Sequence, residues 1–201
     1  MYKEDILKKA LLMGLFSMVL FITLSPVAAW SVPTHYEIAA TTYYALPADV
    51  QSKLSLELMM EGADDPDLKF LDYQYHKYPE NQPKVDYWLN RGSIDYKNGN
   101  YNDASYSFGV ATHYIADGSC APHCPDNTSH YEHSIYELNA LILTPKIDYS
   151  GGDIHSIMNN DFIDGKDSWQ SWMNNRNCIY IQNDLNRAVS ASFTAINESV
   201  S

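Results

Sequence analysis

The chain has 201 residues, of which 45% are hydrophobic and 13% aromatic, so it can bury one sizeable core and falls within the size range of a single domain. Its formal net charge is −12 at pH 7, from 13 basic and 25 acidic side chains, which leaves no basic stripe for a nucleic-acid backbone. Nucleic-acid binding by the polypeptide alone is therefore disfavoured, although bound cations would change the local field.

The first 29 residues predict an export signal. Three lysines precede an apolar run from Ala10 to Leu24, and small residues follow up to Ala29. The apolar run is shorter than the roughly 18 to 20 residues that a membrane-spanning helix needs. We therefore expect cleavage after Ala29, so that the mature, secreted chain is one domain over residues 30–201 and begins with Trp30.

Export would place the three cysteines in an oxidising environment. One disulfide and one free thiol is the simplest expectation for such a set, and the sequence leaves all three pairings of Cys120, Cys124 and Cys178 open. Cys120 and Cys124 flank His123. A disulfide that stiffens this loop is favoured over coordination of a metal by the thiolates.

Apolar residues at helical spacing recur through most of the mature chain and predict an all-α fold, a single compact multi-helix domain. The predicted helices cover residues 35–45, 47–62, the surroundings of 85–99, the surroundings of 108–115, 131–143 and a long amphipathic final segment near 181–196. Residues 150–165 are rich in Gly, Asn and Asp and are expected to form a connection. No alternating strand pattern, internal repeat or dividing linker is evident.

Two pairs of His and carboxylate residues share a four-residue spacing. His113 and Asp117 lie on one predicted helix, and His133 and Glu137 lie on the next, so each pair shares a helix face. His123 stands between the pairs, just after a proline that should end the first helix. A single pair of this kind more often lies in solvent at the end of a helix than in a metal site. Together the five residues indicate a zinc site, because zinc favours imidazole nitrogen and carboxylate oxygen.

Further candidate ligands lie upstream. Trp30 would offer a free α-amine, whose ordinary pKa of about 7.7 lets a metal displace its proton near neutral pH. His35 follows at the start of the first predicted helix, and His76 lies within YQYHKYP. The segment EGADDPD contributes Asp64, Asp67 and the aspartate between them, although acids after a helix usually form a solvated turn.

With these residues in place, the chain resembles the bacterial zinc-dependent phospholipase C family and its relatives, the single-strand-specific zinc nucleases. The phrase THYIADGSCAPH meets the family's H-x3-D-x5-H pattern, and HSIYE meets its H-x3-E pattern. The resemblance covers nearly all of the mature chain. It implies an all-helical domain that holds three Zn²⁺ ions through nine residues, namely Trp30, His35, Asp67, His76, His113, Asp117, His123, His133 and Glu137.

The resemblance also implies how the ligands are divided. One ion would be held by Asp67, His76, His113 and Asp117, its neighbour by the Trp30 amine, His35 and the shared Asp117, and the third by His123, His133 and Glu137. Asp67 and Asp117 would be the catalytic residues. Two alternatives remain open on the sequence, since Asp64 could replace Asp67 and His130 could replace His133.

The function implied by the resemblance is that of a secreted, monomeric phosphodiesterase. A phospholipase C that hydrolyses the glycerol-phosphate ester of phospholipids with a metal-activated water is the favoured member of this class, with transient contact at a membrane surface. The alternatives are a single-strand-specific zinc nuclease, which would bind nucleic acid, and a secreted zinc protein without catalysis. The interval from Asp67 to His76 is short for the family and predicts a trimmed rim around the cleft.

Overall fold

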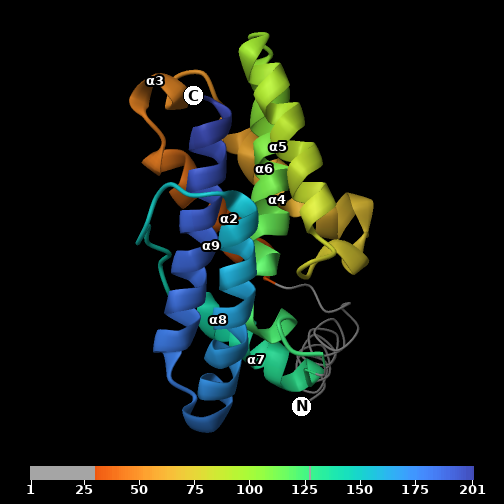
Figure 1. The fold of residues 1–201 in the computed structure, drawn as a ribbon, viewed down its shortest axis with the longest axis vertical. Coiled ribbons are helices and arrows are strands. Elements are labelled where there is room, and N and C mark those ends of the chain that lie inside the picture. Colours follow the sequence, from red (N-terminus) through yellow and green to blue (C-terminus); the bar gives the residue numbers. More distant parts are fainter. Residues whose placement is uncertain (1–29, 127) are drawn as a thin grey trace, which may run out of the picture.

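A computed structural model describes residues 30–126 and 128–201, and the predicted export signal lies outside these residues. Within them the protein is all-α and has no strands, as predicted. The long helices α5, α6 and α9 run along the longest axis of the molecule (Figure 1). Among the described helices, none combines the length and the apolar character required to cross a membrane.

Eight α-helices and three short helical turns make up the described chain. The α-helices are α2 (Val32–Ala45), α3 (Ala48–Gln51), α4 (Leu56–Asp65), α5 (Gln82–Lys97), α6 (Tyr101–Gly118), α7 (His130–Ala140), α8 (Ile154–Asn175) and α9 (Cys178–Ser199). The short turns are η1 (Pro66–Phe70), η2 (Tyr73–Tyr75) and η3 (Ala121–His123). Two of these turns, η1 and η2, fill the connection between α4 and α5.

Two of the predicted boundaries are wrong. The segment 47–62 is not one helix, because Ser55 starts a second helix, α4, by accepting a hydrogen bond from the Leu58 N–H at 3.3 Å. The segment 150–165 is not a connection, because α8 begins at Ile154. Asp153 caps α8 by accepting from the Ser156 N–H at 2.9 Å. The low helix propensity of Gly, Asn and Asp is overridden here by capping and by packing against α9.

Helix α6 is the centre of the fold. Every residue from Ser107 to Gly118 is buried, and α4, α5, α9, α2 and α8 all contact the helix. A helix enclosed on all sides usually carries apolar residues alone. This one also carries His113 and Asp117, both 0% exposed. Buried ionisable groups of this kind require partners, which directs attention to their surroundings.

Helices α4 and α6 touch at two glycines. A Cβ atom on Gly62 would lie 2.3 Å from the Tyr106 carbonyl oxygen, and one on Gly109 would lie 2.1 Å from the Met59 carbonyl oxygen. Only glycine allows the two backbones to approach this closely. The contact lies one turn before His113 and brings the C-terminal end of α4 against the part of α6 that carries the buried ionisable groups.

The expectation of one disulfide is wrong for the described residues, because no disulfide joins Cys120, Cys124 and Cys178. The Cys124 thiol lies against Gly165 of α8, where a Cβ atom would come within 2.4 Å of the sulfur, and it donates to the Cys120 carbonyl oxygen at 3.5 Å. Cys178 begins α9. The Cys124 side chain is thus committed to the packing of η3 on α8.

Candidate metal centre

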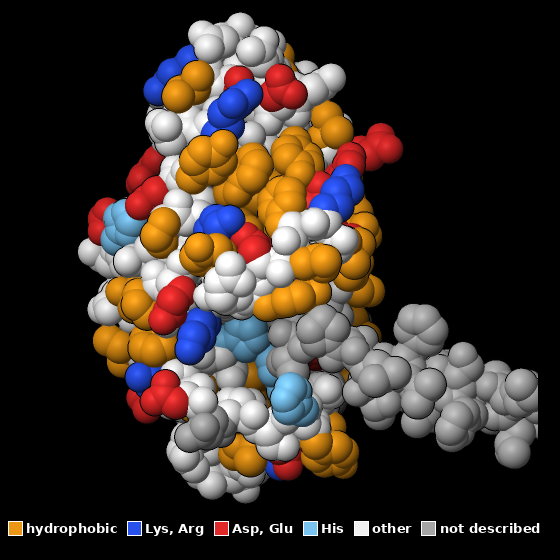
Figure 2. Space-filling model, turned by 90° about the vertical axis from the view of Figure 1, so that its right-hand side faces the viewer, with side chains coloured by type: hydrophobic (Ala, Val, Ile, Leu, Met, Phe, Trp, Pro, Cys, Tyr) orange, Lys and Arg blue, Asp and Glu red, His pale blue; other side chains and the backbone are white. Residues whose placement is uncertain are grey.

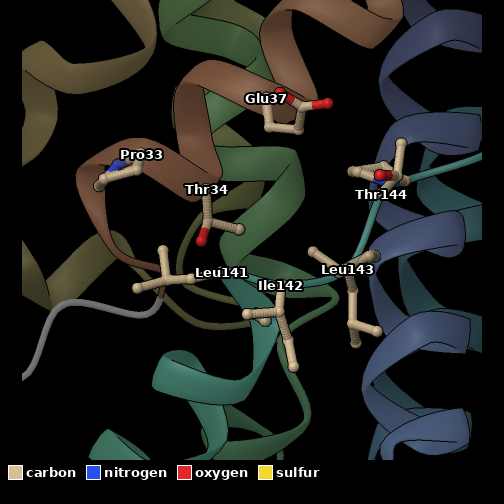
Figure 3. Close-up of a pocket in the computed structure, with 10 residues that line it drawn as sticks. Pro33, Thr34, Glu37, Leu141, Ile142, Leu143 and Thr144 are labelled. Carbon is tan, nitrogen blue, oxygen red and sulfur yellow. The ribbon is translucent and has the colours of Figure 1, made fainter.

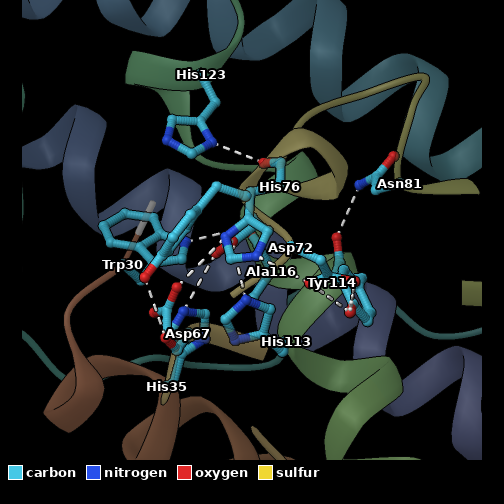
Figure 4. A network of polar contacts seen from close by, with 12 residues as sticks. Trp30, His35, Asp67, Asp72, His76, Asn81, His113, Tyr114, Ala116 and His123 are labelled. Atoms are coloured by element: carbon cyan, nitrogen blue, oxygen red, sulfur yellow. Dashed lines mark hydrogen bonds and ion pairs between the residues drawn. The ribbon is translucent and has the colours of Figure 1, made fainter. Parts of the chain in front are cut away.

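Five of the predicted ligands meet inside the protein and form what we call the inner cluster (Figure 4). It contains His35 from α2, Asp67 from η1, His76 from the end of η2, and His113 and Asp117 from α6. None of the five residues is more than 6% exposed. Segments that are far apart in the sequence therefore deliver three imidazoles and two carboxylates to one buried point.

Asp117 lies at the middle of the inner cluster. Its Oδ1 atom is 3.2 Å from His35 Nε2, and its Oδ2 atom is 2.9 Å from His76 Nδ1 and 3.2 Å from His113 Nε2. Asp67 adds a second carboxylate, with Oδ1 3.5 Å from His76 Nδ1. Each oxygen of Asp117 thus faces a different part of the cluster, as a carboxylate shared between two cations would.

The ligand atoms are close enough to converge on metal ions. Two triplets, His35 with Asp67 and His113, and His76 with His113 and Asp117, each have one atom per residue within 4.8 Å of the others. The rings of His35 and His113 stack at a centroid distance of 4.1 Å. Two ligand atoms bound to the same zinc ion, each through a bond of about 2.0–2.2 Å, lie less than 4.8 Å apart, so both triplets are compact enough to bind an ion.

A π-helical turn orients Asp67. The Leu71 N–H donates to the Pro66 carbonyl oxygen, five residues back, at 2.9 Å, and this wider turn interrupts the α-helical register after α4. The structure brings Asp67 to the inner cluster, whereas Asp64 accepts a hydrogen bond from the Tyr36 hydroxyl at 3.2 Å. Asp67, and not Asp64, thus lies within the candidate metal-binding group, and its role as a ligand stays a prediction.

The remaining predicted side-chain ligands form an outer trio of His123, His133 and Glu137. The rings of His123 and His133 lie 5.0 Å apart, and His133 Nε2 is 2.9 Å from Glu137 Oε1. His130, the other candidate, is exposed at the first position of α7. The carboxylate thus pairs with His133, in line with the four-residue spacing.

Backbone carbonyl groups orient two of the histidines. His113 Nδ1 lies 2.8 Å from the Ala63 carbonyl oxygen, and His123 Nδ1 lies 2.7 Å from the His76 carbonyl oxygen. Because a carbonyl only accepts, each Nδ1 carries the proton and donates it. In the neutral form of either ring Nε2 then keeps its lone pair, which is the arrangement that supports histidine ligands in metal sites.

Asp72 lies behind His76, at ion-pair distance from its ring, and was missed from the sequence. Its Oδ1 atom lies 3.7 Å from His76 Nε2, on the ring edge opposite the inner cluster. The Tyr114 hydroxyl donates to both Asp72 oxygens, at 3.0 and 2.9 Å, and Lys84 forms an ion pair with it at 2.6 Å. The signal was present, because Asp72 and His76 show the same four-residue spacing as the other carboxylate–histidine pairs.

The protonation states of His35 and His123 suit metal binding, whereas Asp117 raises the pKa of His113 above its ordinary value despite burial. Burial lowers the pKa of both His35 and His123 to about 4, so both rings are neutral at physiological pH. Burial raises the pKa of Asp67 to about 6. Burial acts in the same direction on Asp117, but the neighbouring His113 and His35 hold the pKa of this carboxyl well below its usual range.

Buried atoms without hydrogen-bond partners provide a direct test of whether a metal fits. Both ring nitrogens of His35 and His76, both oxygens of Asp67 and Asp117, His113 Nε2 and Glu137 Oε1 are buried and make no hydrogen bond. Their closest polar contacts are the histidine–carboxylate pairs within the centre itself. Native proteins seldom leave buried polar atoms unsatisfied. Neutral imidazole nitrogens and carboxylate oxygens are the donors that zinc prefers, so the residues fit the ion.

Trp30 lies beside the inner cluster (Figure 4) and is 0% exposed. Its Nε1–H donates to the Ala116 carbonyl oxygen at 3.0 Å, and its ring lies 6.0 Å from that of Tyr136. These contacts anchor the first described residue next to α6. Coordination through its α-amine depends on cleavage after Ala29, outside the described residues, and stays a prediction.

A cavity of about 270 Å³ leads from the surface to the candidate centre. His76, His123 and His133 line it together with Tyr73, Lys77 and His130. A separate hollow of about 320 Å³ lies between the start of α2 and the segment after α7 (Figure 3). That hollow contains a single ionisable side chain, Glu37, among mostly apolar ones and has no chemical group of the centre.

By fold and site, the protein is an all-helical protein in which a buried cluster of histidines and carboxylates that could hold metal ions lies next to a small cavity. The family model of zinc-dependent phospholipase C matches residues 34–186, and the chain belongs to this family. The resemblance seen in the sequence is thereby confirmed, and with it a function of the zinc phospholipase C type. No curated protein and no solved structure matches the chain.

Proposed function

We propose that the protein is an exported zinc-dependent phosphoric diester hydrolase that cleaves the glycerol-phosphate ester of phospholipids. The observation that carries this proposal is the set of buried nitrogen and oxygen atoms in the inner cluster that make no hydrogen bond outside it, beside a cavity open to solvent. A structural zinc site would have all its ligands closed around the ion, whereas a catalytic site keeps a position that water and substrate can reach.

The ligand groups proposed here are those that the resemblance to the family implies. His76, His113, Asp67 and Asp117 would hold one ion, and His35 with the second oxygen of Asp117 and the Trp30 amine would hold its neighbour. The outer trio would hold a third. Three divalent ions and three carboxylates would leave a local formal charge of about +3, which suits a phosphodiester although the whole chain is acidic. When bound, the ions polarise phosphate oxygens and acidify a coordinated water.

The side chains of the protein would then have specific roles in cleavage of the ester. Asp67 lies at the cluster as a proton acceptor and would take a proton from the attacking water. As the new P–O bond forms, the bond to the glycerol oxygen breaks. The leaving oxygen takes up a proton, and the products are diacylglycerol and the phosphorylated headgroup. Lys77 and His130, which line the cavity, can donate hydrogen bonds to the phosphate oxygens.

The lining of the cavity favours a lipid over a single-stranded nucleic acid. A nuclease groove combines several basic groups with aromatic platforms on which successive bases stack. The cavity has one lysine, Lys77, and one tyrosine, Tyr73, among its lining residues. One phosphodiester fits this environment more readily than a run of stacked nucleotides.

A metal count combined with two substrate assays tests the proposal. Purified protein should contain zinc in the ratio of three ions per chain and should hydrolyse a dispersed short-chain phosphatidylcholine, with little activity on single-stranded DNA. His155→Ala is the matched control, because His155 is 44% exposed and pairs with Asp86 at 3.1 Å, away from the cluster. Zinc binding without hydrolysis of either substrate would favour the non-catalytic alternative.

A further inference from the structure

An apolar patch lies on the surface beside the candidate centre. It consists of Phe70 and Leu71, at the end of η1, and Tyr87 and Trp88 on α5. The Phe70 and Trp88 rings stack at 5.8 Å, and Tyr87 packs edge-on against Trp88 at 5.1 Å. Figure 2 shows hydrophobic side chains gathered on this face above the histidines. Leu71 and Tyr87 are each 58% exposed.

The backbone at Leu71 makes the exposed side chain more informative. Leu71 has φ 53° and ψ 36°, the left-handed conformation in which glycine or asparagine would be less strained. The leucine side chain contributes little hydrophobic free energy to folding, because more than half of it stays exposed to water. Strained positions that persist are concentrated at functional sites. An apolar side chain at this position is therefore better explained by a contact with another molecule than by the stability of the fold.

The patch is rigidly connected to the chemistry. Leu71 closes the same π-helical turn that presents Asp67 to the inner cluster, through its hydrogen bond to Pro66. Phe70 and Trp88 also pack on the hydrophobic core. A surface that bound Leu71 would thus hold the centre at a fixed short distance from itself, without an intervening flexible segment.

Charge limits what this surface can be. The chain has a formal net charge of −12, which repels anionic membranes. The lysines next to the patch are already paired, Lys69 with Glu61 at 2.9 Å and Asp65 at 3.0 Å, and Lys84 with Asp72 at 2.6 Å. Because both lysines are paired with acidic side chains, neither is available to attract acidic headgroups.

We propose that the patch docks the protein on an electrically neutral lipid surface. This inference rests on the proposed function, because a phospholipid substrate is presented at such a surface. Tyr87 and Trp88 would lie at the headgroup level, where amphipathic aromatic rings concentrate, and Leu71 would enter the boundary of the acyl chains. The docked turn then places the mouth of the cavity next to the phosphates.

The test measures binding of the zinc-loaded protein to vesicles of a phosphonate analogue of phosphatidylcholine, which lacks the cleavable ester oxygen. Leu71→Asn should weaken partitioning about tenfold, because the variant loses a mostly exposed leucine side chain. Its melting temperature should stay equal or rise, because asparagine tolerates the left-handed backbone. Tyr87→Ser should also weaken binding. The control is Ile179→Asn, which removes a 50% exposed side chain at the start of α9 and should change binding less than twofold.

Three results would overturn the proposal that the patch docks on a neutral lipid surface. Binding of Leu71→Asn equal to the unmodified protein, or binding that appears only when anionic lipid is added, would overturn the proposal. A patch that instead mediates self-association would show as a dimer that Leu71→Asn separates, and this would overturn it as well. Hydrolysis of dispersed short-chain phosphatidylcholine needs no surface, so its absence would count against the proposed function and not against the patch.

Discussion

Replacement of Asp117 by asparagine tests the shared-ligand assignment most directly. The two oxygens of Asp117 face three histidines at 2.9–3.2 Å, with His35 on one oxygen and His76 and His113 on the other. Asparagine keeps the size of the side chain but removes its charge and one acceptor oxygen. If two ions share this carboxylate, both should lose affinity together.

The size of the effect follows from linkage. Loss of groups that merely support ligands costs about 10- to 100-fold in metal affinity, so we take about 100-fold as a minimum for each ion. Each such factor removes about 2.7 kcal/mol of zinc-dependent stabilisation at saturating metal. Two ions give about 5 kcal/mol. A chain of this size shifts by about 2–4 °C per kcal/mol, so the zinc-induced rise in melting temperature should shrink by roughly 10–20 °C.

The assay is thermal unfolding with chelator and with excess zinc, and the quantity compared is the difference between the two melting temperatures. Using the difference cancels any effect of the substitution on the metal-free fold. His155→Ala should retain the full zinc-induced rise, because His155 is remote from the cluster and paired with Asp86. An equal rise in Asp117→Asn and in the control would refute the assignment of Asp117 as a shared ligand.

The pH dependence of the zinc-induced rise in melting temperature provides a second test. Zinc requires the Asp67 carboxylate, whose pKa burial raises to about 6, so protons compete with zinc below pH 6. His35 and His123, with pKa values of about 4, need not lose a proton in that range. Asp117 raises the pKa of His113 above its ordinary value despite burial, so a proton also competes with zinc at this ring at higher pH than at Asp67. The zinc-induced rise should therefore diminish as the pH falls, first through protonation of His113 and then, below pH 6, of Asp67. A rise that grows on acidification would contradict this reasoning.

Three further predictions concern support, packing and processing. Asp72→Asn should lower kcat by about 10- to 100-fold, because His76 loses the carboxylate behind its ring, and steady-state kinetics on short-chain phosphatidylcholine checks this; unchanged kinetics would dismiss the supporting role. Gly109→Ala should lower the free energy of unfolding in urea by about 1–3 kcal/mol, because α4 must move away from α6, and an unaffected midpoint would argue against the close contact. Protein that retains Ala29 should bind less zinc than protein beginning at Trp30, because an amide replaces the amine, and an identical metal count would show that the N-terminus is no ligand.

The sequence predicted the fold class because the helical apolar pattern is strong. Its failures occurred where local propensity and tertiary packing disagree. The first half of α8 has Gly, Asn and Asp in place of helix formers, yet it is helical because Asp153 caps it and Met158 packs into the core. The break at Ser55 was missed for a related reason, since a serine cap inside an apolar stretch is a weak signal without the contacts around it.

The candidate site was predictable to the extent that ligands share a helix. His113 with Asp117, and His133 with Glu137, are defined by the four-residue spacing alone. Asp67 and Asp64 are not distinguished by this spacing, and the π-helical turn that brings Asp67 to the cluster has no periodic signature in the sequence. The Ala63 carbonyl group that orients His113 is likewise invisible in sequence, because any residue at that position has a carbonyl.

The spread of the cluster along the chain has a consequence for folding. Its members come from α2, η1, the end of η2 and α6, and the outer trio extends the set to η3 and α7. Ions bound here would tie these segments together as a covalent cross-link does, by closing long loops and so restricting the unfolded chain. Because the described cysteines form no disulfide, bound zinc would then be the main cross-link of the fold, and a protein that loses its metal would lose stability together with its reactivity.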